Sequence, residues 1–327
     1  MQGHTGVIKQ RSVGASLPGR PRSLSSQQRS SALIKGVLFL CVFFSVCTTV
    51  TIIAVLLKES VAFFMMDAVS FREYATGTKW APLLGAEKHF GVWPLITGTL
   101  LVTVVAAAVA LPLGVITAMF LSEYAPRRVR AVLKPILEVL AGVPTVVYGF
   151  FALMVLTPSL QWLFNGTGPD AQYIDTFNAL SAGIAVGIMC LPIVCSLSED
   201  AMQAVPRSLR EGAYALGGTR FDVSVKVVFP AALSGIMSSY LLAIARAVGE
   251  TMIVALAAGA SAKMAWNPGS EVQTMTGYIV QIYLGDTDSL GVEYYSTYAI
   301  AATLFIMTLL ITWTGYSISR RFRQVYE

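Results

Sequence analysis

The sequence has little of what enzyme sites are usually built from. It contains only two histidines, His4 and His89, which lie far apart, so no histidine-based catalytic or metal cluster is expected. No GxxxxGK[ST] loop occurs, so the chain is not expected to bind nucleotide by itself. The four cysteines fall in two apolar runs without metal-ligand or paired-disulfide spacing, and we interpret them as small apolar residues. These absences predict a protein that is not an enzyme and that carries no cofactor or metal.

Charge is also scarce, and long apolar runs take its place. Of the 327 residues, 13% are charged and 55% are hydrophobic, which is too apolar for a soluble fold of this length. Several apolar runs reach the roughly 20 residues that a helix needs to cross a bilayer. The fold class is therefore predicted to be all-α, a polytopic membrane protein with six transmembrane helices. The predicted spans are residues 33–57, 95–121, 135–157, 178–197, 231–260 and 296–318.

The remaining segments are predicted from their polarity. Residues 1–32 are rich in Ser, Arg and Gln and are expected to form a disordered cytoplasmic tail. The run at 33–57 is too long for a signal-peptide core and has no A-x-A-like cleavage site, so it is expected to be retained. The other predicted parts are an extracytoplasmic segment (58–94), a five-helix core (95–320) with a cytoplasmic loop (198–230), and a cytoplasmic tail (321–327).

Lysine and arginine alternate between the loops. Seventeen of them lie in the N-terminal tail, the second-to-third loop, the fourth-to-fifth loop and the C-terminal tail, against five in the alternate loops. Because cytoplasmic loops carry an excess of Lys and Arg, both termini are predicted to be cytoplasmic.

Proline and glycine occur inside several predicted spans. Pro112, Pro144 and Pro192 predict kinks or broken helices, which serve either packing or a pathway. Gly183 and Gly187 have GxxxG spacing, which predicts a close helix–helix contact. We expect a second subunit to pack along faces of this kind, the Gly183–Gly187 face included.

The cytoplasmic loop carries a specific spacing. Glu211-Gly212-Ala213 is followed by Gly217 and, further on, by Phe229-Pro230. This pattern resembles the EAA signature of ABC-importer permeases, with Gly212 in place of the second alanine. A short helix ended by Gly217 and followed by a membrane helix that starts at Pro230 could transmit a rigid push. Gly212 and Ala213 would let a partner groove approach, and Glu211 would offer it a charge; the alternative is an ordinary amphipathic connector.

The resemblance extends over most of the chain. The segments FLSEYAPRRVR, LAGVPTVVYGFFAL, VPRSLREGAYALGGTR and IARAVGETM are similar to the permeases of the bacterial phosphate-specific ABC importer. The GTKWAP and FGVWPLITGTL segments and the RRFRQVYE tail favour the C-type subunit. An A-type subunit, or a permease for another oxyanion such as sulfate or molybdate, remains an alternative. An ATP-independent secondary transporter or channel is a more remote one.

The resemblance implies a fold, partners and a location. It implies the type I ABC importer permease fold in the bacterial inner membrane, with membrane lipid around it. The implied partners are a second homologous permease subunit, a cytoplasmic dimer of ATP-binding subunits, an extracytoplasmic phosphate-binding protein and inorganic phosphate. No nucleic acid is implied.

Arg246 and Glu250 are charged residues within the fifth predicted span. Their i,i+4 spacing predicts that both project from one face of the fifth helix. An arginine donates two parallel hydrogen bonds to a phosphate, so Arg246 is predicted to line the substrate pathway. Glu250 could neutralise Arg246 or accept the proton of hydrogen phosphate. The alternative is a structural ion pair.

Overall fold

The structure is a computed structural model that describes residues 24–67, 69–82, 88–165, 173–285 and 291–321. The chain forms two compact units, Met1–Ala54 and Val55–Glu327. Within the described residues, six helical runs are long and apolar enough to cross a membrane, as predicted. These runs are Leu33–Phe64, Trp93–Tyr124, Thr145–Phe164, Ala179–Gln203, Arg220–Val248 and Val292–Arg320.

The first helix, α1 (Leu24–Phe64), is longer at both ends than the predicted span. The prediction of disorder is wrong for residues 24–32, which are helical. Once an apolar run has nucleated a helix, each further residue adds one hydrogen bond, so polar flanking residues extend it. The predicted tail residues 1–23 and 322–327 lie outside the described residues.

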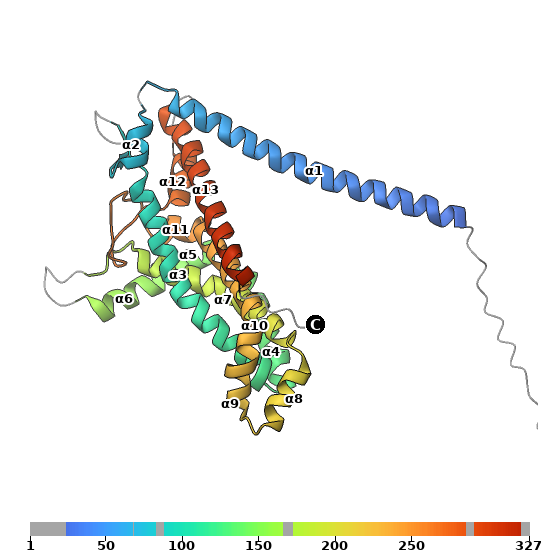
Figure 1. Ribbon diagram of the computed structural model, residues 1–327. Coiled ribbons are helices and arrows are strands. Elements are labelled where there is room, and N and C mark those ends of the chain that lie inside the picture. Colours follow the sequence, from blue (N-terminus) through green and yellow to red (C-terminus); the bar gives the residue numbers. More distant parts are fainter. Residues whose placement is uncertain (1–23, 68, 83–87, 166–172, 286–290, 322–327) are drawn as a thin grey trace, which may run out of the picture. The chain divides into compact units, whose positions relative to one another are not determined.

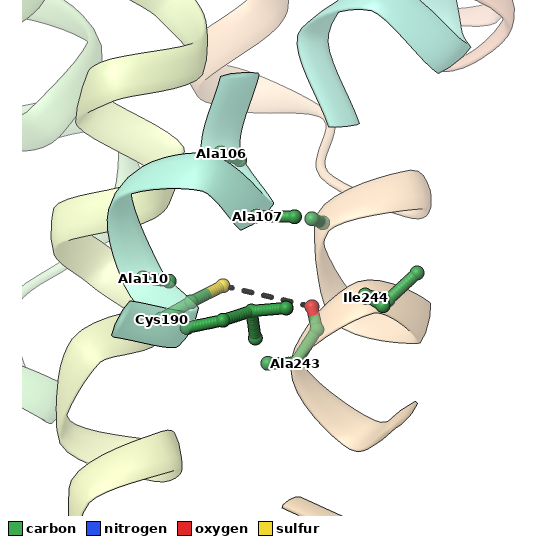
Figure 2. A pocket seen from close by; sticks show the side chains of 8 residues that line it. Ala106, Ala107, Ala110, Cys190, Ala243 and Ile244 are labelled. Carbon is green, nitrogen blue, oxygen red and sulfur yellow. Dashed lines mark hydrogen bonds between the residues drawn. The ribbon is translucent and has the colours of Figure 1, made fainter. Parts of the chain in front are cut away.

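Three helices form the centre of the second unit: α3 (Trp93–Met119), α7 (Ala179–Gln203) and α10 (Phe229–Val248). They lie side by side in Figure 1. Small side chains line the seam where they meet, and Figure 2 shows the Cys190 thiol pointing to the Ala243 carbonyl oxygen, 3.8 Å away. Small residues allow this close backbone approach.

The GxxxG pair lies in the same helix packing. A Cβ built on Gly183 would come within 2.6 Å of Val105, and one on Gly187 within 2.8 Å of Val109. Both glycines are buried against α3 of the same chain. The predicted close contact is confirmed, but the expectation that this face contacts a second subunit is wrong. The sequence shows that small residues allow a contact without showing which helix makes it.

Aromatic residues close one end of the second unit. There α2 (Phe71–Thr76) precedes two short antiparallel strands, β1 (Trp80–Ala81) and β2 (His89–Phe90), with Trp80 opposite Phe90. The Trp80 ring meets Tyr278 of α12 (Met275–Leu284) at 5.0 Å. The Tyr74 hydroxyl lies 2.7 Å from that of Thr303 in α13 (Val292–Arg321). We call this the hairpin end.

The third predicted span is divided. An amphipathic helix, α4 (Arg127–Ala141), is followed by a break at Gly142–Pro144 and then by α5 (Thr145–Phe151), η2 (Ala152–Leu156) and α6 (Thr157–Phe164). The predicted start at Pro135 is wrong, since Pro135 lies inside α4. The break falls at Pro144, where proline disfavours helical geometry in the residue before it. Pro112 and Pro192 lie within α3 and α7, and neither helix is broken there.

The fifth predicted span differs at both ends. Helical structure begins with α9 (Arg220–Val223), continues through a π turn, η3 (Ser224–Val228), and runs into α10. It stops at Gly249, and a separate short helix, α11 (Met252–Ala257), follows. Pro230 therefore does not start the membrane helix. Its ring would clash with the carbonyl of Lys226 in a regular α-helix, and the π turn accommodates it.

Candidate functional site

The helix predicted to carry the EAA-like spacing is α8 (Arg207–Ala215). It ends as predicted: Gly217 has φ +83°, its N–H donates to Tyr214 O at 2.9 Å, and the Gly218 N–H donates to Ala213 O at 3.1 Å. This pair of hydrogen bonds is a Schellman motif, and the left-handed residue in it is favourable only for glycine or asparagine. The turn redirects the chain into Thr219, whose side chain caps α9 together with Asp222.

The exposed residues of α8 are not all those that the spacing predicted. Glu211 and Gly212 are exposed, and a Cβ on Gly212 would meet nothing within 4 Å. Ala213 is half-buried and packs against the hydrophobic core of its own chain. The two small residues therefore differ. Gly212 leaves open space on the surface of α8, whereas Ala213 packs α8 against its own chain.

Three large apolar side chains beside this turn were missed from the sequence. Leu216 is 91% exposed, Phe221 is 65% exposed and Tyr214 is 45% exposed. They lie on α8, its C-terminal turn and α9, at the end of the second unit away from the hairpin (Figure 1). We call this the α8 end. Their apolar character within an otherwise polar segment is the sequence feature that could have indicated an exposed apolar surface here.

Arg246 lies in the last turn of α10, where a cation is favoured by the helix dipole. It is exposed, and it shares one side of α10 with the exposed residues Ser238 and Leu242, at spacings of four. Its described contact is with Met189 of α7, whose sulfur lies 3.7 Å from Nη2. Among the residues that the structure describes, Arg246 forms no ion pair.

Glu250 does not share a helix face with Arg246, and that prediction is wrong. Because α10 ends before Gly249, Glu250 lies in the break before α11. Its carboxylate is buried and accepts the backbone N–H groups of Met252 at 3.2 Å and Ile253 at 3.3 Å. Its own carbonyl accepts from the Thr276 hydroxyl at 2.6 Å. The side chain thus caps α11. These side-chain hydrogen bonds compete with the backbone hydrogen bonds that would continue α10.

Ion pairs tie the helices together at the α8 end. Glu199, buried near the end of α7, lies 3.1 Å from Arg130 Nε and 3.5 Å from Lys134 Nζ, both on α4. Burial works to lower the pKa of Lys134, but the carboxylates of Glu199 and Asp200 raise it overall. Lys134 is therefore held as a cation. No group of three or more His, Cys, Asp or Glu that could hold a metal occurs among the described residues.

Comparison with known proteins places this geometry in a family. Residues 110–324 match the family described as binding-protein-dependent transport system inner membrane component. A probable ABC transporter permease protein, YqgH of Bacillus subtilis, is 35% identical over 301 residues, covering 91% of this chain and 94% of that one. The phosphate transport system permease protein PstC of Mesorhizobium japonicum is 32% identical over 251 residues, covering 73% and 75%.

Solved structures share the fold. An ABC transporter that imports the acidic polysaccharide alginate aligns with a TM-score of 0.63 at 13% identity, over 92% of this chain and 99% of that one. The methionine transporter MetNI aligns with a TM-score of 0.51 at 18% identity, over 72% and 95%. The likeness shows the type I ABC importer permease fold. The family match and the six apolar helices indicate a multi-pass inner-membrane protein. The chain belongs to the family of binding-protein-dependent transport system inner membrane components.

Proposed function

We propose that this permease subunit forms part of the pathway for inorganic phosphate. Relatives at about one-third identity, including the protein of Mesorhizobium japonicum, are named phosphate transport permeases. The observation that carries the proposal is Arg246, an exposed cation in a membrane span without an ion pair among the described residues.

A charged side chain is costly in contact with lipid, so Arg246 has to face water or protein in the membrane. Its side of α10, with Ser238 and Leu242, is left open by this chain. We infer that a second, homologous permease subunit completes the pathway there. The planar guanidinium donates two parallel hydrogen bonds, which suits a tetrahedral oxyanion.

Glu250 contributes to the pathway by shaping it. Its carboxylate holds the first N–H groups of α11, and its backbone oxygen is fixed by Thr276 of α12. These contacts maintain the break that ends α10 just after Arg246. Broken helices of this kind are typical of membrane-embedded binding sites.

We propose that α8 couples the subunit to a dimer of ATP-binding subunits. Glu211 and Gly212 lie on its open side, Ala213 anchors it, Gly217 sets its turn, and Pro230 follows the π turn that leads into α10. Exposed apolar patches that are rimmed by polar residues mark interaction sites on proteins. Leu216, Phe221 and Tyr214 supply such a surface at this end.

The same assignment orients the chain. With α8 on the cytoplasmic side, both termini are cytoplasmic, and the hairpin end faces the phosphate-binding protein outside. This agrees with the distribution of Lys and Arg. The A-type role remains the alternative within the same complex.

The test is uptake by vesicles that contain this subunit, the second permease and the ATPase. Phosphate uptake that requires ATP and a phosphate-binding protein supports the proposal. Uptake of sulfate or molybdate instead, each with its own binding protein, would assign another oxyanion. Uptake without ATP would overturn coupling through α8.

A further inference from the structure

Two motifs that are far apart in the sequence meet at the α8 end. Arg210, on α8, reaches Glu123, at the end of the π turn η1 (Phe120–Tyr124) that follows α3. Arg210 Nη2 lies 3.1 Å from Glu123 Oε1, and the two side chains are only 19% and 9% exposed. Glu123 also accepts the Ser122 hydroxyl at 2.9 Å.

The same guanidinium also holds the end of α7. Nη2 donates to Met202 O at 2.8 Å, and Nη1 donates to Val205 O at 3.2 Å. Carbonyl groups at a helix C-terminus carry partial negative charge, so a cation is favoured there. One side chain of α8 is therefore bonded to both α3, through its π turn, and α7.

No other α8 side chain has such a connection among the described residues. The rest of α8 has no fully buried residue, and Leu209 and Ala213 are only partly buried where they pack against the hydrophobic core. Apolar packing can slide, whereas a half-buried charged bond with fixed geometry resists displacement. Arg210 is thus the directional contact between α8 and the two helices packed most closely in the core.

The element that Arg210 contacts is an irregular helical turn. η1 is a π segment, and such segments occur frequently at functional sites. A second arginine, Arg130 of α4, donates to Leu121 O of the same turn at 2.6 Å. Side chains of both α8 and α4 therefore hydrogen-bond to η1. Since η1 directly follows α3, a displacement of α8 would be transmitted to α3 through η1.

We propose that the Arg210–Glu123 contact is the joint through which α8 moves α3 and α7. Arg210 is then a positioning residue for transport, separate from the surface that docks the ATPase. The proposal rests on the proposed coupling of α8 to an ATPase.

The experiment uses the complete transporter in vesicles and measures phosphate taken up per ATP hydrolysed, together with the amount of ATPase that copurifies. Arg210→Gln and Glu123→Gln are each expected to retain the ATPase and to lower uptake per ATP on the order of tenfold, within the usual range of coupling between sites. The double variant is expected to match Arg210→Gln, because Arg210→Gln already removes the contact with Glu123 together with those to the α7 end. Arg128→Gln, an exposed cation on α4, is the charge-matched control and is expected to match the wild type.

Arg210→Lys covers the case in which Arg210→Gln fails to fold. A lysine keeps the charge but cannot bond Glu123 and both carbonyls with one planar fork, so uptake per ATP should be intermediate. Unchanged uptake per ATP in assembled Arg210→Lys or Glu123→Gln would overturn the joint, as would additive losses in the double variant. Loss of the ATPase from these variants would show a docking role instead. If the wild-type subunit itself retains no ATPase, the proposed coupling fails, and the two failures are distinguishable.

Discussion

Gly217 offers a sharp test of the α8 turn, because a side chain at this position would strain the backbone conformation without a steric clash. The residue has φ +83°, and a Cβ placed on it would meet nothing within 4 Å. A β-branched side chain would therefore not clash, but it would disfavour the left-handed conformation by roughly 1–2 kcal/mol. That corresponds to a loss of about 5–30-fold in the population of the native turn relative to alternatives.

The assay compares Gly217→Val with Gly217→Asn in assembled transporter. Asparagine tolerates the left-handed region, so Gly217→Asn should retain most ATPase binding and uptake, whereas Gly217→Val should lose most of both. Gly36→Val is the matched control, since Gly36 lies in α1, outside the α8 turn, and a Cβ on it would also meet nothing within 4 Å without a positive φ. Equal behaviour of the valine and asparagine variants, whether both active or both inactive, would refute the argument from backbone conformation.

Three further predictions concern packing, docking and the helix break. Gly187→Leu should abolish accumulation of folded subunit, because its side chain would overlap Val109; membrane expression measures this, and normal expression would contradict the packing. Leu216→Ala should weaken copurification of the ATPase several-fold at unchanged expression, because a 91% exposed leucine has its role outside this chain; full retention would remove it from the docking surface. Glu250→Ala should lower the free energy of unfolding by about 0.5–2 kcal/mol through loss of the α11 cap, and Glu250→Gln by less; thermal unfolding in detergent distinguishes them, and identical melting would exclude the cap.

The number of spans followed from the sequence because apolar length is a local property. The break at Pro144 also followed from the sequence, whereas the break after α10 did not. Residues 231–260 look continuous in hydropathy, yet α10 ends at Val248. The Glu250 carboxylate accepts hydrogen bonds from the first N–H groups of α11 instead of continuing the helix. That competition depends on tertiary position, since Thr276 of α12 fixes the Glu250 carbonyl.

The candidate site, too, was predicted only in part from the sequence. The turn at Gly217 follows from spacing, because a glycine after a short helix predicts a left-handed cap. The exposure of Arg246 agrees with a pathway role. The carboxylate of Glu250, its expected partner, accepts backbone N–H groups of α11 instead. The contact between Arg210 and Glu123 joins residues 87 positions apart, and no local pattern indicates such a pairing.

The central claim is that Arg246 contacts the transported anion, and phosphate uptake by Arg246 variants tests it most directly. Uptake is measured in the assembled transporter beside membrane expression, for Arg246→Gln and Arg246→Lys. Arg246→Gln should nearly abolish uptake at normal expression, because the anion would lack a cation in the membrane. Arg246→Lys should retain part of it, because a point charge replaces a two-bond donor. Normal uptake by well-expressed Arg246→Gln would contradict the account and make Arg246 a structural residue.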